Sequence, residues 1–217
     1  MTMTLNNSVL DTRPSMVAQT YGLLSMGLIL AVICSVAALG QVLSFWELVI
    51  GFVASIAFMI GAMVMKHSFG GLVCYFGFVS VMGYLMGPTI SQYLEMPNGA
   101  TIVMQALGAT AVTTVGLSLY AFASGRSFNQ LGGFLFAGLI AVVVASIANI
   151  FFASSLFSVV IAGVSALVFS GYILYDTGRI LSGEVNSPVE GAISMFLNVI
   201  NLFTSLLRLF GFASNSD

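Results

Sequence analysis

Charge is what this chain of 217 residues has least of, because only 6% of its residues are Asp, Glu, Lys or Arg. An ordinary soluble domain has about 25%, so a water-soluble surface cannot be built from this composition. Five basic residues against seven acidic ones leave a net charge of −2. Because no basic surface is available for phosphate groups, we expect no binding of nucleic acid.

Residues that bind metals or perform catalysis are also few, with one histidine and two cysteines. Cys34 and Cys74 lie in apolar segments, and their spacing is not that of a metal site. Intramembrane proteolysis needs a Ser–His pair, a zinc site or two paired aspartates. His67 lies beside Lys66 in a polar break, and Asp176 has no second aspartate in an apolar segment to match it. We therefore predict no metal site, no cofactor and no catalytic residue, and expect that the protein is not an enzyme.

Hydrophobic residues make up 59% of the chain, and the mean hydropathy is +1.09. A helix needs about 20 apolar residues to cross a bilayer, and seven segments have this length. Their apolarity is continuous, unlike the alternating pattern of a membrane barrel. The segments are Val17–Gly40, Phe45–Met65, Phe69–Tyr93, Ala100–Ala123, Leu131–Ala153, Leu156–Leu181 and Val189–Phe212. The sequence thus predicts an all-α, polytopic membrane protein with seven transmembrane helices.

The predicted domain organisation follows from where these segments begin and end. We expect a polar N-terminal tail over residues 1–16, a transmembrane domain over residues 17–213 and a short C-terminal tail over residues 214–217. The stretch Met1–Ser15 has one basic residue and no short apolar core, so it is not typical of a cleaved signal peptide.

The distribution of basic residues predicts the orientation, because cytoplasmic loops are enriched in Lys and Arg. Arg13, Lys66, Arg126 and Arg179 all fall on the side of the bundle where the N-terminus lies. Arg208, near the end of the last segment, is the exception. We therefore place the N-terminus in the cytoplasm and the C-terminus in the periplasm.

Asp176 and Asn198 are the first candidate site, because an ionisable group inside a membrane span is costly and often functional. By residue count, Asp176 lies roughly 8 Å inside the sixth span and Asn198 lies about 13 Å inside the seventh, counted from the same side. A hydrogen bond between them is therefore expected. The pair is either a polar clasp between two helices or a proton- or ion-sensing site. With no cation expected nearby, the Asp176 carboxyl is a candidate to bind and release a proton.

Glu47 and Arg208 form a second candidate pair on the opposite side of the membrane. Glu47 begins the second span, and Arg208 lies near the end of the seventh. Two readings stay open. Each side chain reaches the interface independently, or the two form a buried ion pair that plugs the outer half of the bundle.

Three stretches carry a resemblance to a known family. They are Gly171–Asp176, Ser194–Phe203 and Leu207–Gly211. From about Ser15 to its C-terminal end, the chain resembles the Bax inhibitor-1 (transmembrane Bax inhibitor motif) family, and its bacterial branch most closely. The resemblance implies a seven-helix, multi-pass protein of the bacterial inner membrane.

Two functions are implied by that resemblance. Some members of the family are pH-sensitive calcium leaks, in which two aspartates on the last two helices share a proton and an arginine on the second helix holds the closed state. Members of the bacterial branch modulate membrane-protein quality control through a membrane-anchored, FtsH-type ATP-dependent protease. The expected partners are therefore the lipid bilayer and such a protease, with the calcium ion as the alternative.

This sequence departs from the leak pattern at two positions. Asp176 matches the first aspartate, but Asn198 stands at the second and Phe58 stands where the arginine is expected. A carboxylate pair that shares a proton cannot form here, and one carboxylate with an amide oxygen is a weak calcium site. Glu47 and Arg208, by contrast, match the family's outer ion pair.

We therefore expect a modulator of a protease partner. The alternative is a pH-sensitive leak for calcium or another cation, gated by protonation of Asp176. Two readings of the polar stretch Met1–Ser15 stay open, an ordinary flexible terminus or a disordered handle for the protease.

Overall fold

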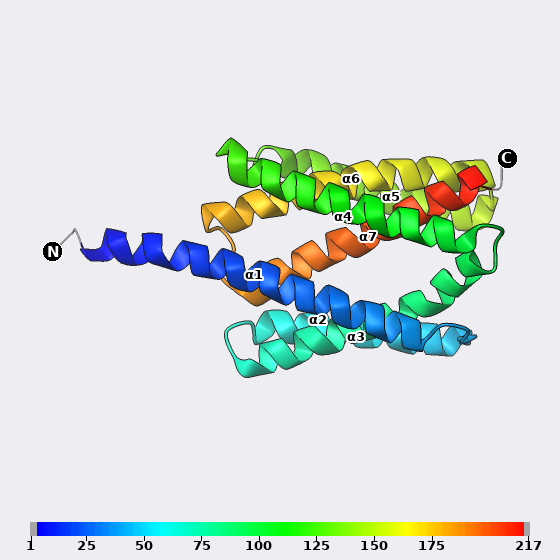
Figure 1. Ribbon diagram of the computed structural model, residues 1–217, viewed down its shortest axis with the longest axis horizontal. Helices are drawn as coiled ribbons and strands as arrows, with labels where there is room; N and C mark the ends of the chain where they lie inside the picture. Colours follow the sequence, from blue (N-terminus) through cyan, green and yellow to red (C-terminus); the bar gives the residue numbers. More distant parts are fainter. Residues whose placement is uncertain (1–3, 215–217) are drawn as a thin grey trace. The chain divides into compact units, whose positions relative to one another are not determined.

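The structure, a computed structural model, describes residues 4–214 and consists of seven long helices (Figure 1). Each of them has a stretch long and apolar enough to cross a membrane. The predicted all-α, seven-helix membrane fold is confirmed, whereas the orientation of the termini stays a prediction. The helices are α1 (Thr4–Ala37), α2 (Phe45–Val64), α3 (Phe69–Leu94), α4 (Gly99–Ser124), α5 (Leu131–Phe152), α6 (Ser155–Ser182) and α7 (Pro188–Ser214).

The first helix differs most from the prediction, because α1 begins at Thr4 and not at Val17. Its apolar stretch is Met16–Ala37, so most of the expected tail is a helical extension of the first span. Loss of apolarity marks where a chain can leave the bilayer, and a helix can continue beyond that point. At the other end α7 reaches Ser214, and the rest of the expected C-terminal tail lies outside the described residues.

The chain divides into two compact units. The first contains the chain up to Gln92 together with Ile180–Phe196, and the second contains Tyr93–Arg179 together with the chain from Leu197. The helix α7 is continuous and contributes to both units. Each unit is described by itself below.

In the first unit, α1 packs closely against α3 through small residues. A Cβ atom on Gly83 would lie 2.6 Å from the Cα atom of Ala31, and one on Gly87 would lie 2.8 Å from the backbone of Ala38. Such a side-chain-free surface lets two transmembrane backbones approach. Gly83 and Gly87 are one helical turn apart, so they lie on the same face of α3.

Aromatic side chains fill the space around this contact. Tyr75 of α3 is fully buried, and its hydroxyl group donates a hydrogen bond of 3.0 Å to the carbonyl oxygen of Leu23 in α1. Phe78 packs edge-to-face against Phe196 of α7, with 5.5 Å between ring centroids. The buried hydroxyl of Tyr75 is therefore satisfied by a backbone acceptor, as burial in an apolar environment requires.

In the second unit, α5 and α6 share a hydrophobic core around Val142, Ile161 and Val168. Only 6% of the apolar stretch of α5 is buried, whereas half of that of α7 is. Large side chains such as Phe134 and Phe151 project outward from α5. This exposure suits a helix that faces lipid, because lipid tails are as apolar as the side chains themselves.

Candidate functional site

Asp176 of α6 and Asn198 of α7 form a buried pair in the second unit. The side-chain amide of Asn198 donates a hydrogen bond of 2.7 Å to Oδ2 of Asp176, and each residue is only 6% exposed. The contact expected from the counted depths is therefore confirmed. It joins two long helices through polar groups that apolar side chains surround.

Arg179 is a third member of this site, and the sequence reasoning missed it. Its Nη1 atom lies 3.2 Å from Oδ1 of Asp176, and its guanidinium carbon lies 5.6 Å from the ring centroid of Tyr175. The expectation that no cation lies near Asp176 was wrong. The available signal was the spacing of three residues along one helix, which brings two side chains to neighbouring positions.

Close packing around Tyr175 and Arg179 fixes this part of α6. A Cβ atom on Gly132 at the start of α5 would lie 2.9 Å from the hydroxyl oxygen of Tyr175, and one on Gly178 would lie 3.0 Å from the ring of Phe128. An added side chain at either glycine would require the Tyr175 or Phe128 ring to shift. The glycines thus set how closely α6 approaches α5 and the connection before it.

A pair of buried hydroxyl groups adjoins the site. The oxygen atoms of Thr177 in α6 and Ser118 in α4 lie 3.5 Å apart, and both residues are buried. Thr177 follows Asp176 directly, so the polar side chains of α6 connect it to α7 on one side and to α4 on another. Polar contacts of this kind hold transmembrane helices in register.

Both carboxylate oxygens of Asp176 already accept a hydrogen bond, one from an amide and one from a guanidinium group. The positive charge of Arg179 opposes binding of a second cation at this carboxylate. No three His, Cys, Asp or Glu side chains are grouped as metal ligands within the part of the chain that the structure describes. The arrangement is chemically one carboxylate held by an amide and a guanidinium group.

Phe58 stands where the resemblance expects an arginine. In the first unit its ring lies against Gly77 of α3, where an added Cβ atom would come within 2.8 Å of the ring. The position therefore contributes to apolar packing between α2 and α3.

Glu47 has a local role that the sequence reasoning did not assign. Its Oε2 atom accepts hydrogen bonds from the backbone nitrogen of Ser44 at 2.7 Å and from the Ser44 hydroxyl at 2.8 Å. The Ser44 oxygen in turn accepts from the Glu47 backbone at 3.3 Å, so the two residues form a capping box at the start of α2. The signal was present as a serine followed three residues later by a glutamate. Glu47 and Arg208 are both exposed and belong to different units, and their pairing stays a prediction.

The chain is similar to known proteins over nearly its whole length. The family described as "Inhibitor of apoptosis-promoting Bax1" matches residues 13–215. A membrane protein of Vibrio cholerae is 43% identical over 199 residues, which cover 91% of this chain and 89% of that protein. Bax inhibitor 1 of Schizosaccharomyces pombe is 30% identical over 177 residues, which cover 79% and 64% of the two chains.

YccA of Escherichia coli is 31% identical over 207 residues, which cover 95% of this chain and 94% of YccA. It bears the name of a modulator of the FtsH protease in strain K12 and of an inner membrane protein in a second strain. These matches, the seven apolar helices and the polar residues of α6 and α7 lead to one assignment. The chain belongs to the Bax inhibitor-1 family and is a multi-pass protein of the bacterial inner membrane.

Proposed function

We propose that this protein modulates membrane-protein quality control by binding the FtsH protease and slowing its action on other membrane substrates. The observation that carries the proposal is the similarity to the FtsH modulator YccA, which extends over 95% of this chain. A regulator of this kind needs a surface and a stable fold, and it needs no catalytic group of its own.

The contacts of Asp176 support this function. Its two oxygens are held by Asn198 and Arg179, at 2.7 and 3.2 Å, so the carboxylate serves as a joint between helices. A carboxylate that links two helices through an amide and has a guanidinium group beside it suits a protein that presents a rigid surface to a partner better than one that passes cations along its interior.

The N-terminal part of α1 is the proposed handle for the protease. The helix starts at Thr4, whereas its apolar stretch starts at Met16. About three turns of helix therefore extend beyond the apolar stretch. A protease anchored in the same membrane could contact this segment outside the bilayer.

The experiment is a degradation assay in proteoliposomes that contain FtsH, a membrane substrate and this protein in increasing amounts. We expect substrate half-life to lengthen with the full chain and to stay short with a variant that lacks residues 1–15. Copurification of the protease with the full chain is the parallel readout. Unchanged half-life together with no copurification would refute the proposed function.

A cation leak is the second candidate, and one observation favours it. Asp176 is an ionisable side chain that is only 6% exposed within a membrane-spanning helix, a position that is often functional in transport proteins. The test is calcium flux into liposomes that contain the purified chain, measured across a pH series. A leak controlled by Asp176 predicts a pH-dependent flux that disappears in Asp176→Asn, whereas no flux in the unmodified chain would eliminate this candidate.

A further inference from the structure

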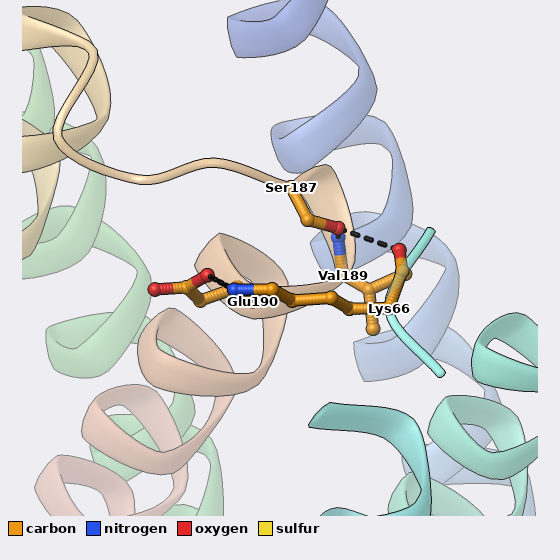
Figure 2. A network of polar contacts seen from close by, with 4 residues as sticks. All are labelled: Lys66, Ser187, Val189 and Glu190. Carbon is orange, nitrogen blue, oxygen red and sulfur yellow. Dashed lines mark hydrogen bonds and ion pairs between the residues drawn. The ribbon is translucent and has the colours of Figure 1, made fainter. Parts of the chain in front are cut away.

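A second polar cluster lies in the first unit, at the connection between α2 and α3. The ammonium group of Lys66 donates to Oε2 of Glu190 in the first turn of α7 over 2.5 Å. The hydroxyl group of Ser187, which precedes α7, donates to the backbone carbonyl oxygen of Lys66 over 2.8 Å. Figure 2 shows the two contacts side by side, so one residue of the connection is held through both its side chain and its backbone.

Ser187 also caps the helix that it holds. Its side-chain oxygen accepts a hydrogen bond of 3.2 Å from the backbone nitrogen of Val189, and its carbonyl oxygen accepts one of 3.2 Å from Gly191. The residue is completely buried. One hydroxyl group therefore satisfies an N-terminal donor of α7 and binds the α2–α3 connection at the same time.

The first turn of α7 is also packed against other parts of the first unit. A Cβ atom on Gly191 would lie 2.8 Å from the side chain of Thr20 in α1 and 3.4 Å from that of Ile180 in α6. The turn is thus held by three elements. Of the two polar contacts of Lys66, the ion pair with Glu190 is partly exposed, whereas the Ser187 side chain that binds its backbone is buried. The side chains of Lys66 and Glu190 are 25% and 15% exposed.

The two charges of this pair are not equivalent. Glu190 lies at the N-terminus of α7, where the helix dipole and free backbone N–H groups favour a negative charge. Lys66 lies on a short connection, and its ammonium group on a flexible stem can turn to water or to lipid headgroups. When the contact breaks, Glu190 keeps a favourable place and Lys66 is the side chain that leaves.

We propose that Lys66, Ser187 and Glu190 form a latch that holds the α2–α3 connection on the first turn of α7 and that can open. Opening frees residues 65–68 and residues 183–187 together. It leaves the hydrogen bond between Asp176 and Asn198 in place, because Asn198 lies about 12 Å farther along α7. The latch goes beyond the proposed function and does not depend on it, since it concerns contacts within the first unit alone.

Lys66 is the only lysine of the chain, which makes its chemistry a direct readout of the latch. The experiment measures acetylation of Lys66 by an N-hydroxysuccinimide ester in lipid nanodiscs, with a lysine-containing peptide in the same tube as a reference. We expect Glu190→Gln to raise the rate at Lys66 about tenfold and Ser187→Ala to raise it by a smaller factor. Glu95→Gln, at an exposed glutamate after α3, is the matched control and should leave the rate unchanged. An unchanged rate in Glu190→Gln would overturn the proposal.

Exchanging the charges supplies the second test. Lys66→Glu and Glu190→Lys should each accelerate deuterium uptake in peptides that cover residues 63–70 and 183–192, by about tenfold. The double variant should restore part of the slow uptake, because it re-forms the ion pair but places a lysine at the N-terminus of α7. Peptides around Asn198 should exchange alike in all variants. Uptake in the double variant that is as fast as in the single variants would overturn the latch, as would equal acceleration around Asn198. If a charge reversal prevents folding, the milder Lys66→Gln and Glu190→Gln variants should each accelerate uptake in the same two peptides and leave the peptides around Asn198 unchanged.

Discussion

Asn198 reaches across from α7 and donates its amide to Asp176 of α6, with 2.7 Å between the two atoms. One carboxylate with an amide partner replaces the two carboxylates that the family resemblance implies for a leak. The site is held together by hydrogen bonds that need no shared proton. Its contribution to stability and its response to substitution are therefore predictable from geometry.

Asn198→Ala removes the donor and leaves Oδ2 of Asp176 without this partner. We expect the free energy of unfolding in detergent to fall by about 0.5–2 kcal/mol, because a buried acceptor loses its hydrogen bond. Asn201→Ala is the control on the same helix, where the amide donates to the backbone oxygen of Leu197 in a less buried position. An equal fall in the free energy of unfolding in the two variants would show that the contact with Asp176 stabilises the protein no more than the contact of Asn201 does.

Asn198→Asp places a second carboxylate beside Asp176, so the two acids must share a proton or repel each other. We expect the thermal midpoint of this variant to fall as the pH rises, since deprotonation of the pair introduces repulsion in a buried site. The measurement is a series of melting curves in detergent at several pH values, compared with the unmodified chain. Parallel pH profiles for the two proteins would contradict the expected repulsion.

Arg179→Gln removes the cation beside Asp176 and leaves the carboxylate with fewer partners. We expect a loss of about 1–3 kcal/mol in unfolding free energy. Arg179→Lys should recover part of this loss, because it restores the charge but not the planar group that lies over the Tyr175 ring. Chemical or thermal unfolding measures both effects. A lysine variant as unstable as the glutamine variant would show that the charge is not what matters here.

Gly83→Ala adds one methyl group where the α1 backbone lies too close to accept it. The new Cβ atom would lie 2.6 Å from Cα of Ala31, and we expect a loss of about 1–3 kcal/mol through overpacking. Gly108→Ala makes the same chemical change at a helical glycine with no atom within 4 Å of the added Cβ. That control should be neutral or slightly stabilising. Similar melting temperatures for the two variants would contradict the close approach of α1 and α3.

Glu47→Ala removes one half of the capping box with Ser44, and we expect a small fall in the thermal midpoint. Glu47→Gln should retain most of the stability, since glutamine also serves at this position of the box. A double-mutant cycle with Arg208→Gln then tests the predicted outer ion pair. Coupling energy near zero would reject that pair, and clear coupling would establish it.

The helices α2 to α7 could be predicted to within two residues at each end. In these helices the apolar stretch and the helix end at nearly the same residue. A residue with positive φ often follows, such as Gly125 or Ala153. For α1 the two events are separated, so the same criterion missed the start at Thr4. The apolar composition of a segment predicts which part of a helix lies in lipid. It does not predict where the backbone hydrogen bonds of the helix begin.

The pairing of Asp176 with Asn198 was predictable because depth in two antiparallel helices can be counted. The contact of Arg179 with Asp176 was not predictable from the sequence. A long side chain can point back along its helix or away to water, and packing decides which of the two directions it takes. Tyr175 and the adjoining glycines supply that packing. The contact between Lys66 and Glu190 was not predicted either, because the two residues are far apart in the sequence.

The first unit is discontinuous in sequence, because it needs Ile180–Phe196 in addition to the chain up to Gln92. During biosynthesis, therefore, α1, α2 and most of α3 are made before the segment that completes their unit. At ordinary rates of translation this delay is on the order of ten seconds. Throughout that interval the nascent protein is itself an unfinished membrane substrate, exposed to the same proteolytic surveillance that its mature form is proposed to restrain.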